Sequence, residues 1–78
     1  METVMEIQVT LYAPLTQGRF KKGSVSLESG GTVDTLLQFL AIEQHEVGSV
    51  FVDGQNSTFT HVLQRGDKVT LLPLIGGG

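Results

Sequence analysis

The chain has 78 residues, enough for one domain and too few for a second hydrophobic core. It contains no cysteine, which excludes disulfides, thiolate zinc sites, iron–sulfur clusters and a nucleophilic thiol. A formal net charge of −3 at pH 7 argues against nucleic-acid binding, because a phosphate backbone calls for a clustered basic face.

The remaining bulk features predict a soluble protein of the cytoplasm. The lack of disulfides fits a reducing compartment. No run of apolar residues is long enough to span a membrane. The first eight residues carry two glutamates and no apolar stretch, so they do not resemble a signal peptide. The basic cluster of Arg19, Lys21 and Lys22 is interpreted as a solvated loop.

Two strands are expected first. Apolar and polar residues alternate over residues 5–12, which is typical of a half-buried strand. The residues expected to face the core are Met5, Ile7, Val9 and Leu11. Pro14 and Gly18 break the pattern, so residues 13–22 are expected to form a loop. Alternation resumes over residues 23–28 with Val25 and Leu27 inward, and the short connection favours an antiparallel pair.

The period then changes to that of a helix. Val33, Leu36, Leu37 and Leu40 stand at i, i+3, i+4 and i+7 and form one apolar stripe. Thr32 is the expected N-cap. A helix of about three turns with a single apolar face needs a sheet to pack against.

The second half is expected to supply two more strands. Residues 49–52 form one of them, closed by an Asp53-Gly54 turn. Residues 56–67 are expected to be irregular, with Phe59, Val62 and Leu63 touching the core and a turn at Gly66-Asp67. Residues 68–75 form the last strand, beside the first in the middle of the sheet. Its pairing is expected to fray at Pro73, because proline has no N–H to donate.

This order of elements predicts the α+β, ubiquitin-like β-grasp fold. In that fold a mixed sheet of four to five strands packs on one main helix. The chain is expected to be a single domain over residues 1–78, with its core at about residues 5–73 and a flexible tail at residues 74–78.

The end of the chain is the most informative segment. Leu72 and Leu74 fall on the face opposite the inward residues, and large apolar side chains there favour a partner or a fold back over the rim of the sheet. The last three residues are glycines, which are narrow and conformationally free. Extended, residues 73–78 reach about 20 Å. That reach would carry a terminal carboxylate into the active site of another enzyme, which could activate it as an acyl-adenylate.

Residues 65–78, RGDKVTLLPLIGGG, resemble the end of the small sulfur-carrier proteins of the ThiS and MoaD family. That family has a Gly-Asp turn, an aliphatic strand, one or two apolar residues and a final Gly-Gly pair. The matching positions here are Gly66-Asp67, residues 69–72, Leu74-Ile75 and Gly77-Gly78. Residues 30–40 are similar to the family's helix start and residues 50–55 to its third strand. The resemblance covers residues 7–78, and residues 9–15 look more like the molybdopterin-side members.

The resemblance implies a mechanism in which this chain is a co-substrate and not an enzyme. An ATP-dependent activating enzyme of the ubiquitin-activating type would adenylate the carboxylate of Gly78, and sulfur from a persulfide would displace AMP to leave a thiocarboxylate. The carrier would then donate the sulfur in cofactor biosynthesis, to the large subunit of molybdopterin synthase or to thiazole synthase.

The resemblance also assigns the site residues. Gly77 and Gly78 carry over as the functional pair. Leu72, Leu74 and Ile75 would line the docking surface, with Phe51 as a further candidate. No bound cofactor, no metal site, no nucleic acid and no membrane are expected.

Several alternatives stay open at this point. Gly76 departs from the pattern, since many relatives have only a Gly-Gly pair, and without Gly78 the terminus would be Gly77. The same tail would serve a ubiquitin-like modifier, and the glycines of a plain β-grasp interaction module would be inert. The receiving pathway is open among molybdopterin, thiamine, tungsten cofactor and tRNA thiolation, although residues 13–22 favour the molybdopterin type. The sequence does not indicate an oligomeric state.

The sequence shows no general acid–base pair and no nucleophile–base pair at a recognisable spacing. His45 stands between Glu43 and Glu46 and is interpreted as part of a solvated helix end rather than a metal site. His61 is interpreted as a loop residue that touches the core.

Overall fold

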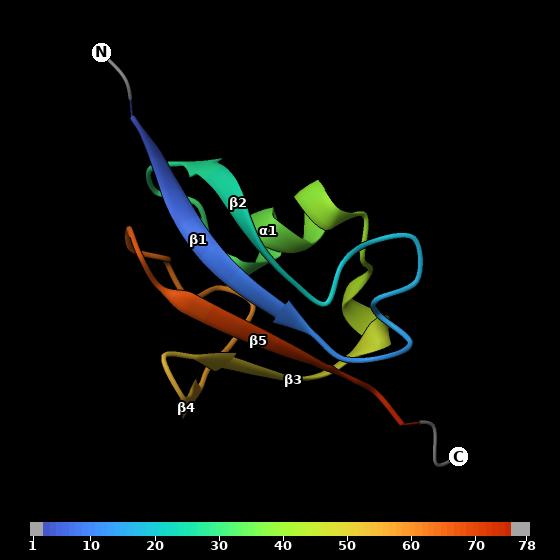
Figure 1. Cartoon of the computed structure of the whole chain (residues 1–78). Helices are drawn as coiled ribbons and strands as arrows, with labels where there is room; N and C mark the ends of the chain where they lie inside the picture. Colours follow the sequence, from blue (N-terminus) through green and yellow to red (C-terminus); the bar gives the residue numbers. More distant parts are fainter. Residues whose placement is uncertain (1–2, 76–78) are drawn as a thin grey trace.

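The computed structural model describes residues 3–75, which form one sheet with a helix packed on one of its faces (Figure 1). The elements in chain order are β1 Val4–Leu11, β2 Lys22–Glu28, α1 Val33–Leu40, the 3₁₀ turn η1 Gln44–Glu46, β3 Val47–Val52, β4 Gln55–Asn56 and β5 Lys68–Pro73. None of the helices in this described part of the chain is long and apolar enough to cross a membrane.

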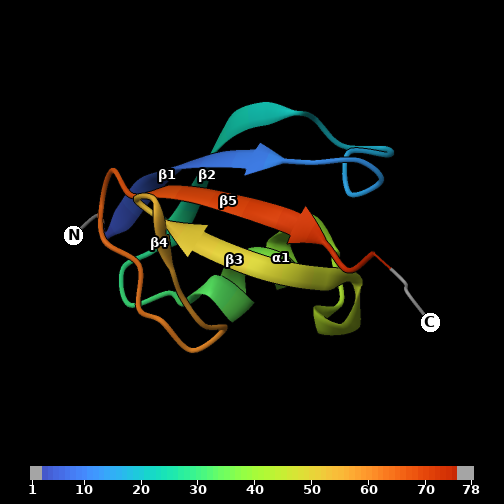
Figure 2. The same cartoon turned by 90° about the horizontal axis from the view of Figure 1, so that it is seen from below.

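The strands are arranged in the order β2-β1-β5-β3-β4. β1 and β5 run parallel in the middle, and the other neighbouring pairs are antiparallel. Figure 2 shows α1 covering one face of this mixed sheet. The predicted antiparallel start, the central position of the last strand and the β-grasp arrangement are therefore confirmed.

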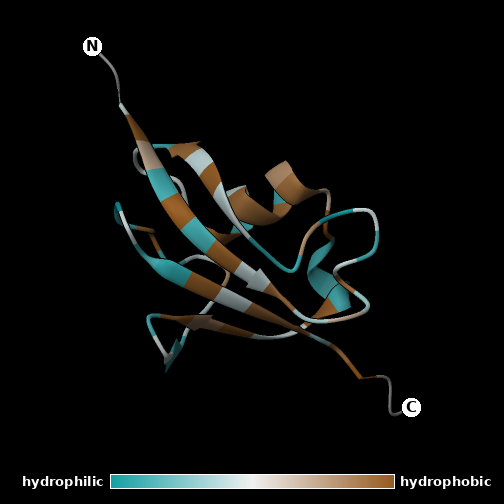
Figure 3. Cartoon of the chain, viewed as in Figure 1, coloured by the Kyte–Doolittle hydropathy of each residue, from teal (hydrophilic) through white to brown (hydrophobic). Residues whose placement is uncertain are grey.

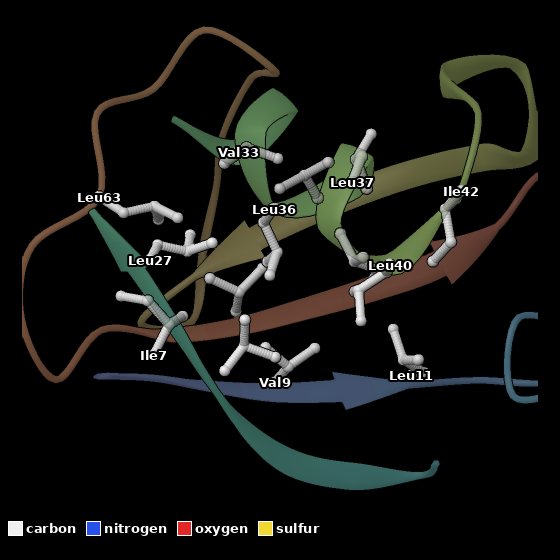
Figure 4. Packing of buried hydrophobic residues seen from close by; sticks show 14 of the residues in the cluster. Ile7, Val9, Leu11, Leu27, Val33, Leu36, Leu37, Leu40, Ile42 and Leu63 are labelled. Atoms are coloured by element: carbon white, nitrogen blue, oxygen red, sulfur yellow. The ribbon is translucent and has the colours of Figure 1, made fainter. Parts of the chain in front are cut away.

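The core lies between the inner face of the sheet and α1 (Figure 4). The alternating positions of β1 and β2 and the stripe of α1 are buried as predicted. The most deeply buried side chains are Ile7, Val9, Leu15, Val33, Leu36, Leu37, Leu63, Val69 and Leu71.

Helix α1 begins with a reciprocal cap. Thr32 Oγ1 accepts a hydrogen bond from the N–H of Thr35, and Thr35 Oγ1 accepts one from the N–H of Thr32. The predicted N-cap is confirmed. The helix has eight residues, about two turns instead of three. It ends at Ala41, which adopts a left-handed conformation and returns its N–H to the carbonyls of Leu37 and Gln38.

The interpretation of Arg19 as a solvated loop residue is wrong. Arg19 is partly buried and donates from Nε to the carbonyl of Leu40 at 2.8 Å and from Nη2 to that of Ala41 at 2.9 Å. Its Nη1 donates to the carbonyl of Leu15 at 2.9 Å. The guanidinium thus ties the loop after β1 to the C-terminal carbonyls of α1, where a positive charge is favourable. Lys21 and Lys22 are exposed as expected.

The segment between β3 and β5 differs from the prediction in two places. It contains the short strand β4, paired with the end of β3. Val62 is 48% exposed, while Leu63 is buried and Phe59 packs partly against the core. The backbone explains this placement. Val33 N–H donates to the carbonyl of His61, and Leu63 N–H donates to that of Gly31. These bonds hold the segment against the start of α1 without burying Val62.

Candidate functional site

The candidate site is the point where β5 leaves the sheet, just before the glycines. Leu71 is buried there, and its carbonyl accepts from the N–H of Tyr12 at 3.3 Å on the β1 side. On the other side, Pro73 pairs with Val47 of β3. The N–H of Leu74 donates to the carbonyl of Glu46 at 2.9 Å. The expectation that pairing frays at Pro73 is therefore wrong.

A β-bulge explains why proline is tolerated at this position. Leu72 pairs with Ser49, but the next residue, Pro73, pairs with Val47, so Gly48 is the extra residue on β3. Proline is compatible with a sheet at such irregularities, because the regular ladder of hydrogen bonds is already interrupted. The sheet therefore holds the exiting chain up to Leu74.

Gly48 permits this close approach. A Cβ atom at position 48 would lie 2.8 Å from the carbonyl oxygen of Pro73 and 3.0 Å from the Cα of Leu74. Both contacts are with backbone, which has little freedom to move away. Sequence reasoning missed Gly48. Its signal is a glycine inside a strand, VGSVFV, which often marks a bulge or a close backbone approach.

The four predicted docking residues come from the two neighbouring strands β3 and β5. Phe51 pairs with Thr70, and Leu72 pairs with Ser49, so Phe51 and Leu72 are diagonal neighbours. Both are partly buried on the sheet face opposite the core, since the residues that alternate with them are inward.

Leu74 and Ile75 follow β5 and are 60% and 79% exposed. Figure 3 shows this apolar stretch continuing past the end of β5. Tyr12, which the sequence did not single out, is 52% exposed, and its N–H contacts β5 at the same end. The exit is thus a rim where apolar side chains face solvent.

The predicted glycine pair, Gly77 and Gly78, and the preceding Gly76 lie outside the described residues. The structure therefore defines where the chain departs toward these glycines. Their role stays a prediction.

The remaining chemistry of the described chain is sparse. Within residues 3–75, no three His, Cys, Asp or Glu side chains come together in a way that could hold a metal ion. His45 Nδ1 lies 3.5 Å from Glu43 Oε1 with both side chains exposed, and His61 is also exposed.

Comparison with known proteins gives one family match. A model described as the ThiS family matches residues 9–78. No curated protein sequence matches this chain.

Three solved structures are similar in fold. The small archaeal modifier protein 1 of Haloferax volcanii is 18% identical, with a TM-score of 0.74, over 91% of this chain and 99% of that one. The putative molybdopterin converting factor subunit 1 of Pyrococcus furiosus has the same identity, TM-score and coverage, 18%, 0.74, 91% and 99%.

The third structure is a complex of subunits 1 and 2 of the molybdopterin-converting factor of Helicobacter pylori. Its matching chain is 18% identical, with a TM-score of 0.58, over 95% of this chain and all of that one. These likenesses show the ubiquitin-like β-grasp fold.

Proposed function

This chain belongs to the ThiS family, and from that membership we propose that it is a sulfur carrier. It serves as a co-substrate: it is charged by one enzyme and discharged by another, and it performs no catalysis of its own. The observation that carries the proposal is the exposed Leu74-Ile75 pair at the end of β5, directly before the three glycines.

In the proposed cycle, a carboxylate oxygen of Gly78 attacks the α-phosphorus of ATP on an activating enzyme, and pyrophosphate leaves. The terminal sulfur of a persulfide then attacks the acyl carbonyl, and AMP leaves. A thiol cleaves the resulting sulfur–sulfur bond and releases the thiocarboxylate. Each step needs the carbonyl of Gly78 inside a narrow active site, and the absence of side chains from residues 76–78 supports that access.

The docking surface of the proposal consists of Phe51, Leu72, Leu74 and Ile75. An apolar rim beside the exit would bury against the activating enzyme while the glycines enter its active site. Leu74 has two roles in this surface. Its exposed side chain is available to the partner, and its N–H binds the chain to the carbonyl of Glu46. The anchor fixes the backbone at Leu74, which reduces the entropy lost when this side chain docks.

The sulfur-accepting partner is proposed to be a synthase. The Helicobacter pylori structure holds subunit 1 of the molybdopterin-converting factor together with subunit 2, which supports a partner of that kind for this chain. The resemblance of residues 9–15 to the molybdopterin-side members points the same way. Thiazole synthase is the alternative acceptor.

The direct test is mass spectrometry of the intact chain after incubation with an activating enzyme, ATP and a sulfur donor. Replacement of one oxygen by sulfur raises the mass by about 16 Da. The gain should require ATP and should vanish in a variant that lacks Gly77 and Gly78. No gain with an activating enzyme that charges a sulfur carrier of the same family would contradict the proposal.

A ubiquitin-like modifier is the second candidate, and the similarity to small archaeal modifier protein 1 favours it. It shares the adenylation step but ends in an isopeptide bond to a lysine. Immunoblots of cells that express the chain would then show larger conjugates, and these would be lost on deletion of Gly77 and Gly78. If that deletion changes neither sulfur transfer nor conjugates nor partner binding, the glycines are inert and the chain is an interaction module.

A further inference from the structure

The strand β2 has an open edge. It lies at one border of the sheet, and β1 is its only neighbour among the strands of the described chain. Its pairing with β1 is regular from Thr10–Lys22 to Val4–Glu28. Figures 1 and 2 show it along one border of the sheet, away from the exit of β5.

Two hydrogen bonds show which backbone groups face that open edge. The carbonyl of Lys21 accepts from the N–H of Leu11 at 2.8 Å, and the N–H of Ser29 donates to the carbonyl of Thr3 at 2.6 Å. In an antiparallel pair, alternate residues direct both backbone groups to the same neighbour, so the odd-numbered residues of β2 bond to β1. The residues whose N–H and C=O point away from β1 are Lys22, Ser24, Ser26 and Glu28. The carbonyl of Glu28 also accepts from the N–H of Gly31 at 3.0 Å, so it has one lone pair left for a partner.

This edge lacks the features that usually prevent pairing with another strand. In natural proteins, edge strands are kept from pairing with other strands by proline, bulges, short length or charged residues along the strand. β2 has seven residues, no proline and no register shift. Its charges stand only at its two ends, Lys22 at the start and Glu28 at the finish, with an uncharged stretch between them.

We propose that β2 pairs antiparallel with β2 of a second copy of this chain, about a two-fold axis that passes beside Val25. In this register Lys22 lies opposite Glu28 of the second copy, and Ser24 lies opposite Ser26 of the second copy. Symmetry repeats both pairs. The sheets of the two copies become one continuous sheet through the shared edge.

Charge and hydrogen bonding select this register. It gives a partner to the outward-facing N–H groups of all four residues, with the N–H of Lys22 meeting the carbonyl of Glu28 that also accepts from Gly31, and it places both charged ends opposite their complements. A shift of two residues in either direction leaves one end of the strand without a partner and separates Lys22 from Glu28 of the second copy. Parallel pairing would place Lys22 against Lys22 and Glu28 against Glu28, which is unfavourable.

An exposed aromatic residue beneath the edge supports the same interface. Phe39 of α1 is 61% exposed. It lines a hollow with Ser26, Leu27, Glu28, Thr35 and Gln38. The hollow therefore lies between the helix and the open edge. A second β2 strand along that edge would cover it.

The proposed register places a complementary feature over this hollow. Gly23 of the second copy lies opposite Leu27, on the inner side of the sheet. The ring of Phe20 lies close to that side of Gly23, with Cδ1 3.2 Å from where a Cβ would stand. Phe39 therefore faces Phe20 of the second copy, and such aromatic pairs add to the stability of an interface.

The pairing leaves the exit of β5 accessible. β1 separates β2 from β5 in the sheet, so the end of β5 does not take part in the shared edge. The two-fold axis directs the two exits toward opposite ends of the dimer. Each copy would therefore present its own docking surface independently.

A charge-exchange experiment tests the inference on the full chain. Sedimentation equilibrium should detect a dimer over protein concentrations from about 1 μM to about 1 mM. Lys22→Glu and Glu28→Lys each replace two attractive pairs with two repulsive ones and should weaken the dimer roughly tenfold or more. Both side chains are exposed, so circular dichroism should show the same fold in each variant.

Two further samples should restore association. The Lys22→Glu/Glu28→Lys double variant inverts the pairs and keeps the net charge, so its dimer should match the original. An equimolar mixture of the two single variants should form a heterodimer, because each charge then meets its opposite. Lys68→Glu makes the same charge change on β5, two strands from the edge, and should leave the dimer unchanged.

A monomeric mass over the whole concentration range would overturn the proposal. So would a dimer that the single variants do not weaken, because its interface would lie elsewhere. A dimer that is weakened by the single variants but restored neither by the double variant nor by the mixture would overturn the register.

Discussion

The N–H of Leu74 donates to the carbonyl oxygen of Glu46, 2.9 Å away, one residue beyond the proline at which pairing was expected to fray. This bond extends the ordered path of β5 to the residue whose side chain is the first exposed apolar group of the exit. Leu74 is therefore both the residue that anchors the chain and the first residue of the proposed docking surface. The first two predictions test these two roles.

The first prediction concerns the bulge that lets β3 and the exit approach each other. Gly48→Ala introduces a Cβ 2.8 Å from the carbonyl oxygen of Pro73, so the backbone of the exit must shift. We expect a loss of about 1–3 kcal/mol in the free energy of unfolding, measured by urea titration, and slower charging with sulfur.

Gly23→Ala is the matched control, because its Cβ would meet the ring of Phe20 at 3.2 Å, and a side chain yields more easily than backbone. Equal destabilisation by the two variants would contradict the close-approach role assigned to Gly48.

The second prediction separates docking from folding. Leu74→Asp and Ile75→Asp alter side chains that are 60% and 79% exposed, so the melting temperature should change little. Pyrophosphate exchange catalysed by an activating enzyme should show KM for the carrier raised by about tenfold or more, because an apolar anchor is lost from the interface.

Val62→Asp is the corresponding control, since Val62 is also exposed but stands next to the start of α1, away from the exit. An equal rise in KM for this variant would show that the effect comes from added charge and not from docking at the exit.

The third prediction tests Arg19 as a clamp between a loop and α1. Arg19→Met keeps much of the apolar stem but removes the hydrogen bonds to the carbonyls of Leu15, Leu40 and Ala41. The expected loss is about 1.5–3 kcal/mol in the free energy of unfolding. Lys21→Met removes an exposed positive charge two residues away and should change stability by less than about 0.5 kcal/mol. A similar loss in both variants would point to net charge as the cause.

The fourth prediction concerns the start of α1. Thr32→Ala removes the side chain that accepts from the N–H of Thr35 and should cost about 1 kcal/mol by thermal or urea unfolding. Thr35→Ala removes the reciprocal acceptor. Because the two hydroxyls form one cap, the double variant should lose less than the sum of the single losses. Strict additivity would contradict the cap as a unit.

Local patterns in the sequence were enough to predict most of the fold. Alternation placed Ile7 and Val9 inward, and the 3.6-residue period placed Leu36 and Leu37 against the sheet, because in both cases one face must leave water. The last strand could be assigned to the middle because its stretch VTLL favours a strand and is not interrupted by glycine or proline.

The missed features depend on partners that are distant in the sequence. Arg19 donates hydrogen bonds to the carbonyls of Leu40 and Ala41, which lie 21 and 22 residues further along the chain. No local pattern of charge reveals a contact at that separation. The bulge at Gly48 is defined by the path of residues 73 and 74, and Val62 is placed by backbone bonds of its neighbours rather than by its own side chain. At the site, the sequence indicated which apolar residues stand before the glycines, but it did not indicate the anchor at Glu46.

The parallel alignment of β1 and β5 has a practical consequence for labelling. Two central strands that run in the same direction place Thr3 at one pole of the molecule and Leu74 at the other. A fluorophore, affinity tag or fused domain attached ahead of Thr3 would therefore sit at the far pole from the docking rim. Immobilising the molecule through its N-terminal side should leave the rim unobstructed for binding measurements.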